Sequence, residues 1–435
     1  MIPNFYDLCK TAKLHVCATD RFKAGMLSVS FLIPVDVETV CMAPLLLSVL
    51  RRGTEKYPTL SDINRRLDYL WGTAFSIRSF FRGNCLVVGF TADLLDSVYL
   101  PSDGDGIIDG VLELMEQLLF HPMLDEDGLL YRRYVESEKQ MQCDAIRAAK
   151  NNPKAYAAER CKALLLEGEA GGIPLYGTEE QTMAITREQL TAFWRDLLKN
   201  LRPDCFYVGC EDAQVVLNKL EKVFGGRLAD TAGASPHACG TVREGRGICR
   251  SETMSVSQSQ LMMVYRCGVQ FNHPDQPVCT VLNEMLGNSP ISRLFVHVRE
   301  KQSLCYSCAS SYSAYYGTFL ISCGLKSENR RLAEREIKRQ IQCLAQGDFR
   351  PEELDAAKKS LANTYRQIED SPSGLESYYF GRALVGNTKS LEACRADFEK
   401  VTAEDVMRIA QTLTLDVTYF LEGTLVGEGE DEDED

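Results

Sequence analysis

Residues 28–35 read SVSFLIPV and residues 262–269 read MMVYRCGV, two strand-like runs that are 234 positions apart. Each run is followed by a break and then by a helical segment. The same offset relates Gly83 to Gly317, and each glycine lies between two alternating apolar runs. One constant offset that links several features in the same order indicates a duplication. We therefore predict two homologous domains of about 200 residues each, a usual domain size.

The periodicity of apolar residues predicts an α+β fold in both halves. Alternation predicts a strand at 27–35 and a hairpin at 72–90, whereas Ile63, Leu67 and Leu70 share one helical face, with Ser61 as the expected N-cap. Further helices are expected at 107–119, 126–149, 156–166, 187–200, 278–286, 291–299, 330–345, 352–368 and 403–412. Helices grouped between hairpins predict, in each domain, a mainly antiparallel sheet with helices packed on one face.

Composition suggests where the domains begin and end. Residues 226–250 are rich in Gly, Ala, Ser and Thr and have little apolar periodicity, which is typical of a linker. We expect an N-terminal domain at 1–225, a C-terminal domain at 251–427 and a disordered acidic tail at 428–435.

Charge and cysteine usage exclude several classes of protein. The net charge is −13, seven of the acidic residues lie in the tail, and no basic stripe with interleaved aromatic residues is present, which argues against a nucleic-acid partner. The 17 cysteines are scattered through expected core elements of a long chain, so reduced thiols are expected. The start does not resemble a signal peptide, and no apolar run reaches the roughly 18 residues of a membrane span. These features predict a cytoplasmic protein without a membrane partner.

The most specific motif lies in the second half. Residues 292–306 read S-R-L-F-x-x-V-R-E-K-x-x-L-x-Y, and Gly317 follows 11 positions after the tyrosine. This pattern resembles the C-terminal-domain signature of the insulinase/pitrilysin-like metallopeptidases. Zinc enzymes of that family carry an inverted H-x-x-E-H motif. The resemblance covers nearly the whole chain and is greatest for inactive bacterial subunits of the family.

The first half has no metal ligands where the resemblance would place them. Residues 51–54 (RRGT) occupy the place of the short turn that follows the family's motif. This alignment puts Pro44 and Ser48 at the positions of the two zinc histidines and Leu47 at the position of the glutamate. The family's third ligand, a glutamate on a later helix, corresponds to Ala145. These four residues mark a degenerate metal site.

Elementary metal chemistry supports the same expectation. A zinc site needs about three protein ligands and a nearby carboxylate to activate water. The five histidines are His15, His121, His237, His273 and His297. No two of them are close in sequence. We expect no metal and no cofactor in this chain, with zinc on a partner subunit. An active peptidase with unconventional ligands stays an alternative.

Arg299 and Tyr306 are the candidate substrate-binding residues. The resemblance implies that they bind the substrate peptide around its scissile carbonyl, a role that suits a planar cationic donor and a phenol. The spacing alone is also compatible with a surface pair between Arg299 and Glu300 and with Tyr306 packed against a helix. The C-x-x-C at Cys305 and Cys308 has no second pair nearby in sequence, so we interpret it as thiols in or near the core.

Together these features predict a non-catalytic, substrate-binding subunit of a heterodimeric zinc peptidase. Its two domains would enclose a peptide-binding chamber, its substrate would be a peptide or an unfolded polypeptide, and its partner would be a family member that contains H-x-x-E-H. A stand-alone peptide-binding or scaffolding protein is the alternative from another class.

Overall fold

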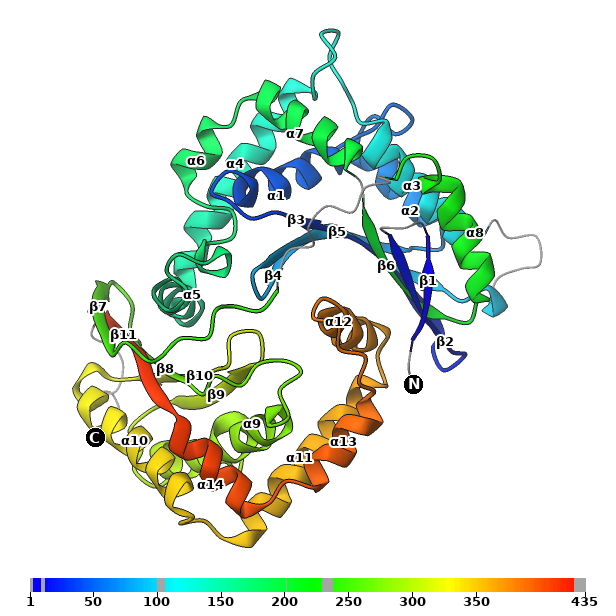
Figure 1. Cartoon of the computed structure of the whole chain (residues 1–435). Helices are drawn as coiled ribbons and strands as arrows, with labels where there is room; N and C mark the ends of the chain where they lie inside the picture. Colours follow the sequence, from blue (N-terminus) through cyan, green and yellow to red (C-terminus); the bar gives the residue numbers. More distant parts are fainter. Residues whose placement is uncertain (1–2, 9–11, 100–105, 201, 229–237, 426–435) are drawn as a thin grey trace, which may run out of the picture. The chain divides into compact units, whose positions relative to one another are not determined.

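The computed structural model describes residues 3–8, 12–99, 106–200, 202–228 and 238–425, which form two compact units (Figure 1). Unit 1 comprises Met1–Arg147, Ile173–Ala238 and Gln367–Ser390, and unit 2 comprises Ala148–Gly172, Cys239–Arg366 and Leu391–Asp435. The expected acidic tail at 428–435 and residues 229–237 of the expected linker at 226–250 lie outside the described residues. The domain boundaries therefore stay a prediction.

Unit 1 is built on a six-stranded sheet in the order β1-β2-β6-β3-β5-β4. Its strands are β1 (Asn4–Asp7), β2 (Lys13–Ala18), β3 (Ala24–Ile33), β4 (Ala74–Arg82), β5 (Cys85–Leu95) and β6 (Pro203–Gly209). Only the β2–β6 pair is parallel. Leu27, Val29 and Phe31 alternate along β3 and are buried in the hydrophobic core, because successive side chains of a strand point to opposite faces.

A layer of helices covers this apolar face (Figure 1). Its helices are α1 (Thr39–Leu50), α2 (Leu60–Tyr69), α3 (Ile107–Phe120), α4 (Arg132–Ala148), α6 (Glu179–Ala184), α7 (Arg187–Lys199) and α8 (Ala213–Phe224). The N-cap of α2 is Thr59, which forms a capping box with Asp62. The expectation of Ser61 as the cap was wrong, because the reciprocal Thr59–Asp62 pair satisfies the first backbone N–H groups two residues earlier.

The opposite face of the unit 1 sheet carries one helix from the far end of the chain. Helix α12 (Pro372–Ala383) packs on β3 and β6. Its buried Glu376 accepts hydrogen bonds from Ser28 Oγ (3.0 Å) and from Arg78 Nη2 (2.7 Å). This polar contact fixes α12 against the face of β3 that does not enter the main core.

Unit 2 is built on a five-stranded sheet in the order β7-β11-β8-β10-β9. Its strands are β7 (Ile248–Met254), β8 (Ser259–Arg266), β9 (Ser307–Ser313), β10 (Thr318–Leu325) and β11 (Thr414–Gly423). Only the β7–β11 pair is parallel. One face packs on α5 (Pro153–Leu165) through Ala157, Cys161, Met262 and Tyr419.

The other helices of unit 2 lie on the opposite side of the sheet from α5 (Figure 1). They are α9 (Gln276–Asn283), α10 (Arg330–Gln346), α11 (Pro351–Ile368), α13 (Leu391–Glu399) and α14 (Ala403–Thr412), with two π-helical segments, η4 (Glu284–Asn288) and η5 (Phe295–Glu300). Short 3₁₀ turns complete the described elements at η1 (Ser97–Tyr99), η2 (Ala149–Asn151), η3 (Ala170–Gly172) and η6 (Ser327–Asn329). No helix of the described residues is long and apolar enough to cross a bilayer.

The two units share one topology, which confirms the predicted duplication and the α+β fold class. The strand order β2-β6-β3-β5-β4 of unit 1 matches β7-β11-β8-β10-β9 of unit 2, including the one parallel pair. Gly83 and Gly317 occupy the equivalent hairpin turns with φ of 59° and 62°, a backbone conformation that glycine adopts without strain. Each sheet has its main helix layer on one face. The single helix on the other face, α5 or α12, comes from the opposite half of the sequence.

Candidate functional site

Helix α1 carries the three positions at which the sequence analysis expected a degenerate metal site. Pro44 and Leu47 are buried, and Leu47 is part of the hydrophobic core of unit 1. Ser48 is partly exposed. A proline ring and a leucine side chain offer no metal ligand, and a neutral serine hydroxyl is not among the usual ligands of zinc.

Helix α4 faces α1 through residues other than Ala145. Gln142 donates to Cys41 O (3.2 Å) and to Thr182 Oγ1 (3.1 Å), whereas Ala145 is exposed. Nearer the end of α1, Glu138 forms an ion pair with Arg52. Burial raises the pKa of Glu138, and the Arg52 charge opposes that shift. Glu138 and Gln142 were not predicted from the sequence, although both follow the helical period that places Val135 in the core.

The residues around α1 therefore do not fit a catalytic zinc ion. The nearby carboxylate, Glu138, is occupied by Arg52. In the part of the chain that the structure describes, the one group of three or more His, Cys, Asp or Glu ligand atoms lies in unit 2 and not at α1. Buried His15 is held by Asp204 (2.8 Å) and stacks on Phe206. Reaction steps that need a metal at α1 have no support in this geometry.

We expect α1 to contribute nothing to metal binding or hydrolysis. The isolated chain should cleave no peptide, and neither added zinc nor a chelator should change that result, because Pro44 and Leu47 supply neither ligand nor base. Elemental analysis should give the same metal content for wild type and for Ser48→Ala. A metal ion that is lost on Ser48→Ala would show that α1 is a ligand-bearing helix after all.

The motif at residues 292–306 in unit 2 is anchored by buried polar side chains. Arg293 is 6% exposed and donates to Gln340 Oε1 of α10 (2.9 Å) and to Glu353 of α11 (3.0 Å). Ser292 Oγ donates to Ser289 O (2.5 Å). A buried cation that is fully paired holds its segment in one orientation, because breaking the pair would leave an uncompensated charge. These contacts fix the start of η5 against α10 and α11.

Glu336 of α10 fixes the end of the same segment. It accepts hydrogen bonds from Gln340 Nε2 (2.5 Å), from Arg339 and from Gln302, which follows η5 in the chain. Burial alone would raise the pKa of Glu336, but these hydrogen bonds and the Arg339 charge outweigh burial and lower the pKa to about 2. The segment between Arg293 and Gln302 is thus tied to α10 at both ends.

This shift predicts how stability depends on pH. Because the folded-state pKa of about 2 lies below the ordinary value of roughly 4.3, Glu336 contributes stability above the ordinary value. That contribution should be lost as the pH falls from about 4.3 towards 2. Urea denaturation across this range should therefore show a smaller acid-induced loss for Glu336→Gln than for wild type. Equal losses in both proteins would contradict the assignment.

Arg299 lies on η5, and its guanidinium is accessible to a ligand. Its side chain is 43% exposed, its guanidinium lies 4.8 Å from the ring centre of Phe295, and its Nε lies 3.7 Å from Glu300. The surface pair with Glu300 that the sequence left open is therefore present, but it is long and solvent-exposed. Such a pair contributes little free energy and does not prevent the guanidinium from binding an anion.

Tyr306 is positioned by a hydrogen bond of its main chain, and more than half of the residue is exposed. Its N–H donates to Gly324 O of β10 (2.8 Å), and its residue is 56% exposed. Within the described residues its hydroxyl has no hydrogen-bond partner. Tyr306 is therefore not buried against a helix. A tight turn joins the two candidates, since Ser303 N donates to Arg299 O (3.0 Å) and Leu304 N donates to Val298 O (3.1 Å).

Comparison with known proteins places this arrangement in a family. Residues 184–361, which include the Arg299 and Tyr306 segment, match the model of the peptidase M16 inactive domain. The chain is thus a homologue of the M16, or insulinase, peptidases. The chain is 28% identical over 412 residues to the probable inactive metalloprotease YmfF of Bacillus subtilis, covering 94% of this chain and 95% of that protein. This finding confirms the resemblance inferred from the sequence.

Other relatives include zinc proteases by name. The uncharacterized zinc protease YmxG of Bacillus subtilis is 23% identical over 309 residues, covering 69% of this chain and 72% of that protein. The M16 fold is matched by a conserved protein from Enterococcus faecalis, with a TM-score of 0.88, 22% identity and coverage of 98% of this chain and 100% of that one. A peptidase M16 inactive domain from Pseudomonas fluorescens gives a TM-score of 0.76 at 17% identity, covering 99% of this chain and 100% of that one. This chain is accordingly an inactive M16 metalloprotease homologue.

Proposed function

We propose that this M16 chain is the non-catalytic, substrate-binding subunit of a zinc peptidase, and that a second M16 chain with an H-x-x-E-H motif supplies the zinc. The observation that carries the proposal is the contrast between the two units. Helix α1 carries buried Pro44 and Leu47 at two of the positions expected for the metal site. The Arg299 and Tyr306 segment, in contrast, is anchored by buried side chains and exposes these two residues.

Arg299 and Tyr306 suit the binding of a peptide near a reacting carbonyl. A guanidinium and a phenol are hydrogen-bond donors that strengthen as negative charge develops on a carbonyl oxygen. Neither donor is consumed by a strong contact within the described residues, because the Glu300 pair is long and exposed. In this proposal both groups act on a substrate whose bond is cleaved at the partner's zinc site.

An extended peptide or an unfolded polypeptide is the proposed substrate. Strand β9 begins directly after Tyr306 and is the last strand of its sheet. An edge strand presents unpaired backbone groups to which an extended segment can add by main-chain hydrogen bonds. Such binding depends little on side-chain identity, which agrees with a subunit that holds varied peptides.

Two further observations agree with the proposal. Bacillus subtilis contains both kinds of relative, one named a probable inactive metalloprotease and one named a zinc protease, as a two-chain enzyme requires. The cysteines that the structure describes are all free thiols. Free thiols are typical of a reducing compartment, so we assign this subunit to the cytoplasm.

A pull-down tests the partnership. The tagged chain, purified under native conditions from the cells that express it, should bring down an M16 relative with an intact H-x-x-E-H motif in comparable amount, as identified by mass spectrometry. If the chain purifies repeatedly without a zinc-bearing relative, the scaffolding alternative replaces the heterodimer.

A further inference from the structure

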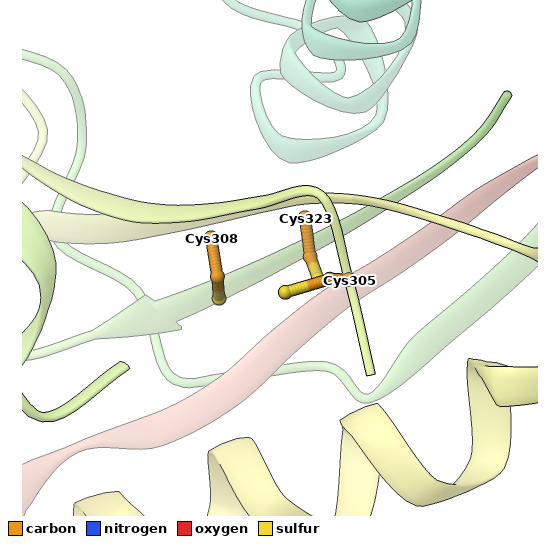
Figure 2. A group of neighbouring side chains, drawn as sticks. All are labelled: Cys305, Cys308 and Cys323. Atoms are coloured by element: carbon orange, nitrogen blue, oxygen red, sulfur yellow. The ribbon is translucent and has the colours of Figure 1, made fainter. Parts of the chain in front are cut away.

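Three cysteines gather beside the Arg299 and Tyr306 segment. Cys308 of β9 lies directly opposite Cys323 of β10 in the strand register. Cys305 precedes β9 and adds a third thiol, and the three sulfur atoms all lie within 4.8 Å of one another. Figure 2 shows the side chains of Cys308 and Cys323 on the same side of the hairpin, with the sulfur of Cys305 directed towards them.

This cluster changes the interpretation of the C-x-x-C motif. From the sequence alone, Cys305 and Cys308 are expected to be thiols in or near the core, because no second cysteine pair lies nearby in the chain. Cys308 and Cys323 are indeed buried, but Cys305 is partly exposed. The cluster is therefore accessible from one side, as a site that exchanges a ligand with solvent must be.

The donor set and its dimensions suit one type of ligand. Zinc binds thiolate sulfur at about 2.3 Å, which places the sulfur atoms of a tetrahedral site roughly 3.8 Å apart. Three sulfur atoms within 4.8 Å of one another reach that geometry by small side-chain movements. Thiolates favour zinc and other soft metals over magnesium or calcium, whose ligands are oxygen atoms.

We propose that Cys305, Cys308 and Cys323 form a binding site for one thiophilic metal ion, Zn²⁺, with an open fourth position on the side of Cys305. This departs from the expectation that the chain holds no metal, which rested on the missing ligands of α1. We assign the site no hydrolytic role, because no general base stands among its ligands. Binding would fix the main chain at Cys305, next to Tyr306, and it requires no partner subunit.

The charges around the cluster are consistent with this ligand. Three thiolates and one Zn²⁺ ion carry a net charge of −1. The positive charge of Arg299 acts on Cys305, and that of Lys154 acts on Cys308. These cations offset the residual negative charge, which would otherwise be costly next to a buried strand pair.

Metal titration of the full chain tests the site. The chain is purified under reducing conditions, stripped with a chelator and titrated with Zn²⁺, with Co²⁺ as a spectroscopic probe. We expect one ion per chain and a sulfur-to-cobalt charge-transfer band. Cys305→Ser, Cys308→Ser and Cys323→Ser should each weaken binding by more than the roughly 10- to 100-fold that is typical for loss of a supporting residue. The matched controls Cys249→Ser, exposed, and Cys343→Ser, buried in α10, should bind as wild type.

A second measurement avoids the risk that a buried variant fails to fold. In the wild-type chain, Zn²⁺ should slow the alkylation of Cys305 and leave that of Cys249 unchanged, as measured by mass spectrometry of peptides. The proposal is overturned if the fully reduced wild-type chain binds no metal, or if Zn²⁺ binds without protecting Cys305. It is also overturned if the three thiols are found only as a disulfide that, once reduced, takes up no ion.

Discussion

Arg299→Ala is expected to lower the peptide turnover of a complex reconstituted with the zinc-bearing partner by roughly ten- to a thousandfold, the range typical for removal of one donor to a developing oxyanion. The guanidinium is exposed and its pair with Glu300 is loose, so its loss should cost the isolated chain little stability. Tyr306→Phe removes only the hydroxyl and should act in the same direction. Steady-state kinetics on the purified complex measures both effects.

Matched controls separate this role from a general effect of substitution. Arg350→Ala removes a guanidinium from the surface of the same unit, where its side chain is 80% exposed, and Tyr69→Phe removes the hydroxyl of a tyrosine that is 77% exposed in unit 1. Both should retain wild-type turnover, and all four variants should co-elute with the partner. If Arg299→Ala and Tyr306→Phe assemble and cleave at the wild-type rate, the substrate-binding role is wrong.

Asp416→Ala should destabilise unit 2 by about 3–5 kcal/mol, the usual cost of leaving a buried charge without its partner. Asp416 is fully buried and accepts hydrogen bonds from Arg266 Nε (2.5 Å), from Arg246 Nε (3.1 Å) and from the Arg246 N–H (2.9 Å). Arg266 is 3% exposed, so the substitution would leave its buried positive charge without the Asp416 carboxylate beside β8 and β11.

Urea denaturation followed by far-UV circular dichroism measures this effect. Tryptophan fluorescence reports on unit 1, because Trp71 and Trp194 both belong to it. Arg350→Ala, which breaks only a 3.7 Å surface contact with Glu353, should change stability by no more than about 1 kcal/mol. A loss of less than about 1 kcal/mol for Asp416→Ala would mean that the buried network does not hold β8 and β11 together.

Much of the fold could be predicted because the helices and strands follow the local periodicity of apolar residues. The offset that relates Gly83 to Gly317 predicted two units of one topology, and both glycines do occupy equivalent turns. The placement of α5 and α12 could not be predicted. Periodicity shows that a helix has an apolar face, but it does not show which sheet that face covers. The Glu376–Arg78 hydrogen bond and the core cluster that contains Ala157 and Met262 decide it, and both join residues far apart in the chain.

The candidate site divides in the same way. Arg299 and Tyr306 could be selected as candidates because their motif is a short local sequence. Both residues are exposed in the structure. Cys323 could not be associated with Cys305 and Cys308 from the sequence, because only the register of β9 on β10 brings it opposite Cys308. Glu138 was missed for a related reason. Its partner Arg52 follows α1, and the two meet only when α4 packs on that helix.

The central claim is that this chain binds substrate for a zinc site on another chain. The most direct test measures the cleavage of a fluorogenic peptide by this chain alone, by its zinc-bearing relative alone, and by an equimolar mixture of the two. We predict no cleavage by this chain alone, little cleavage by the relative alone, and full activity in the mixture. The activity of the mixture should fall when this chain carries Arg299→Ala. Cleavage by this chain alone, or equal rates for the relative with and without it, would contradict the account.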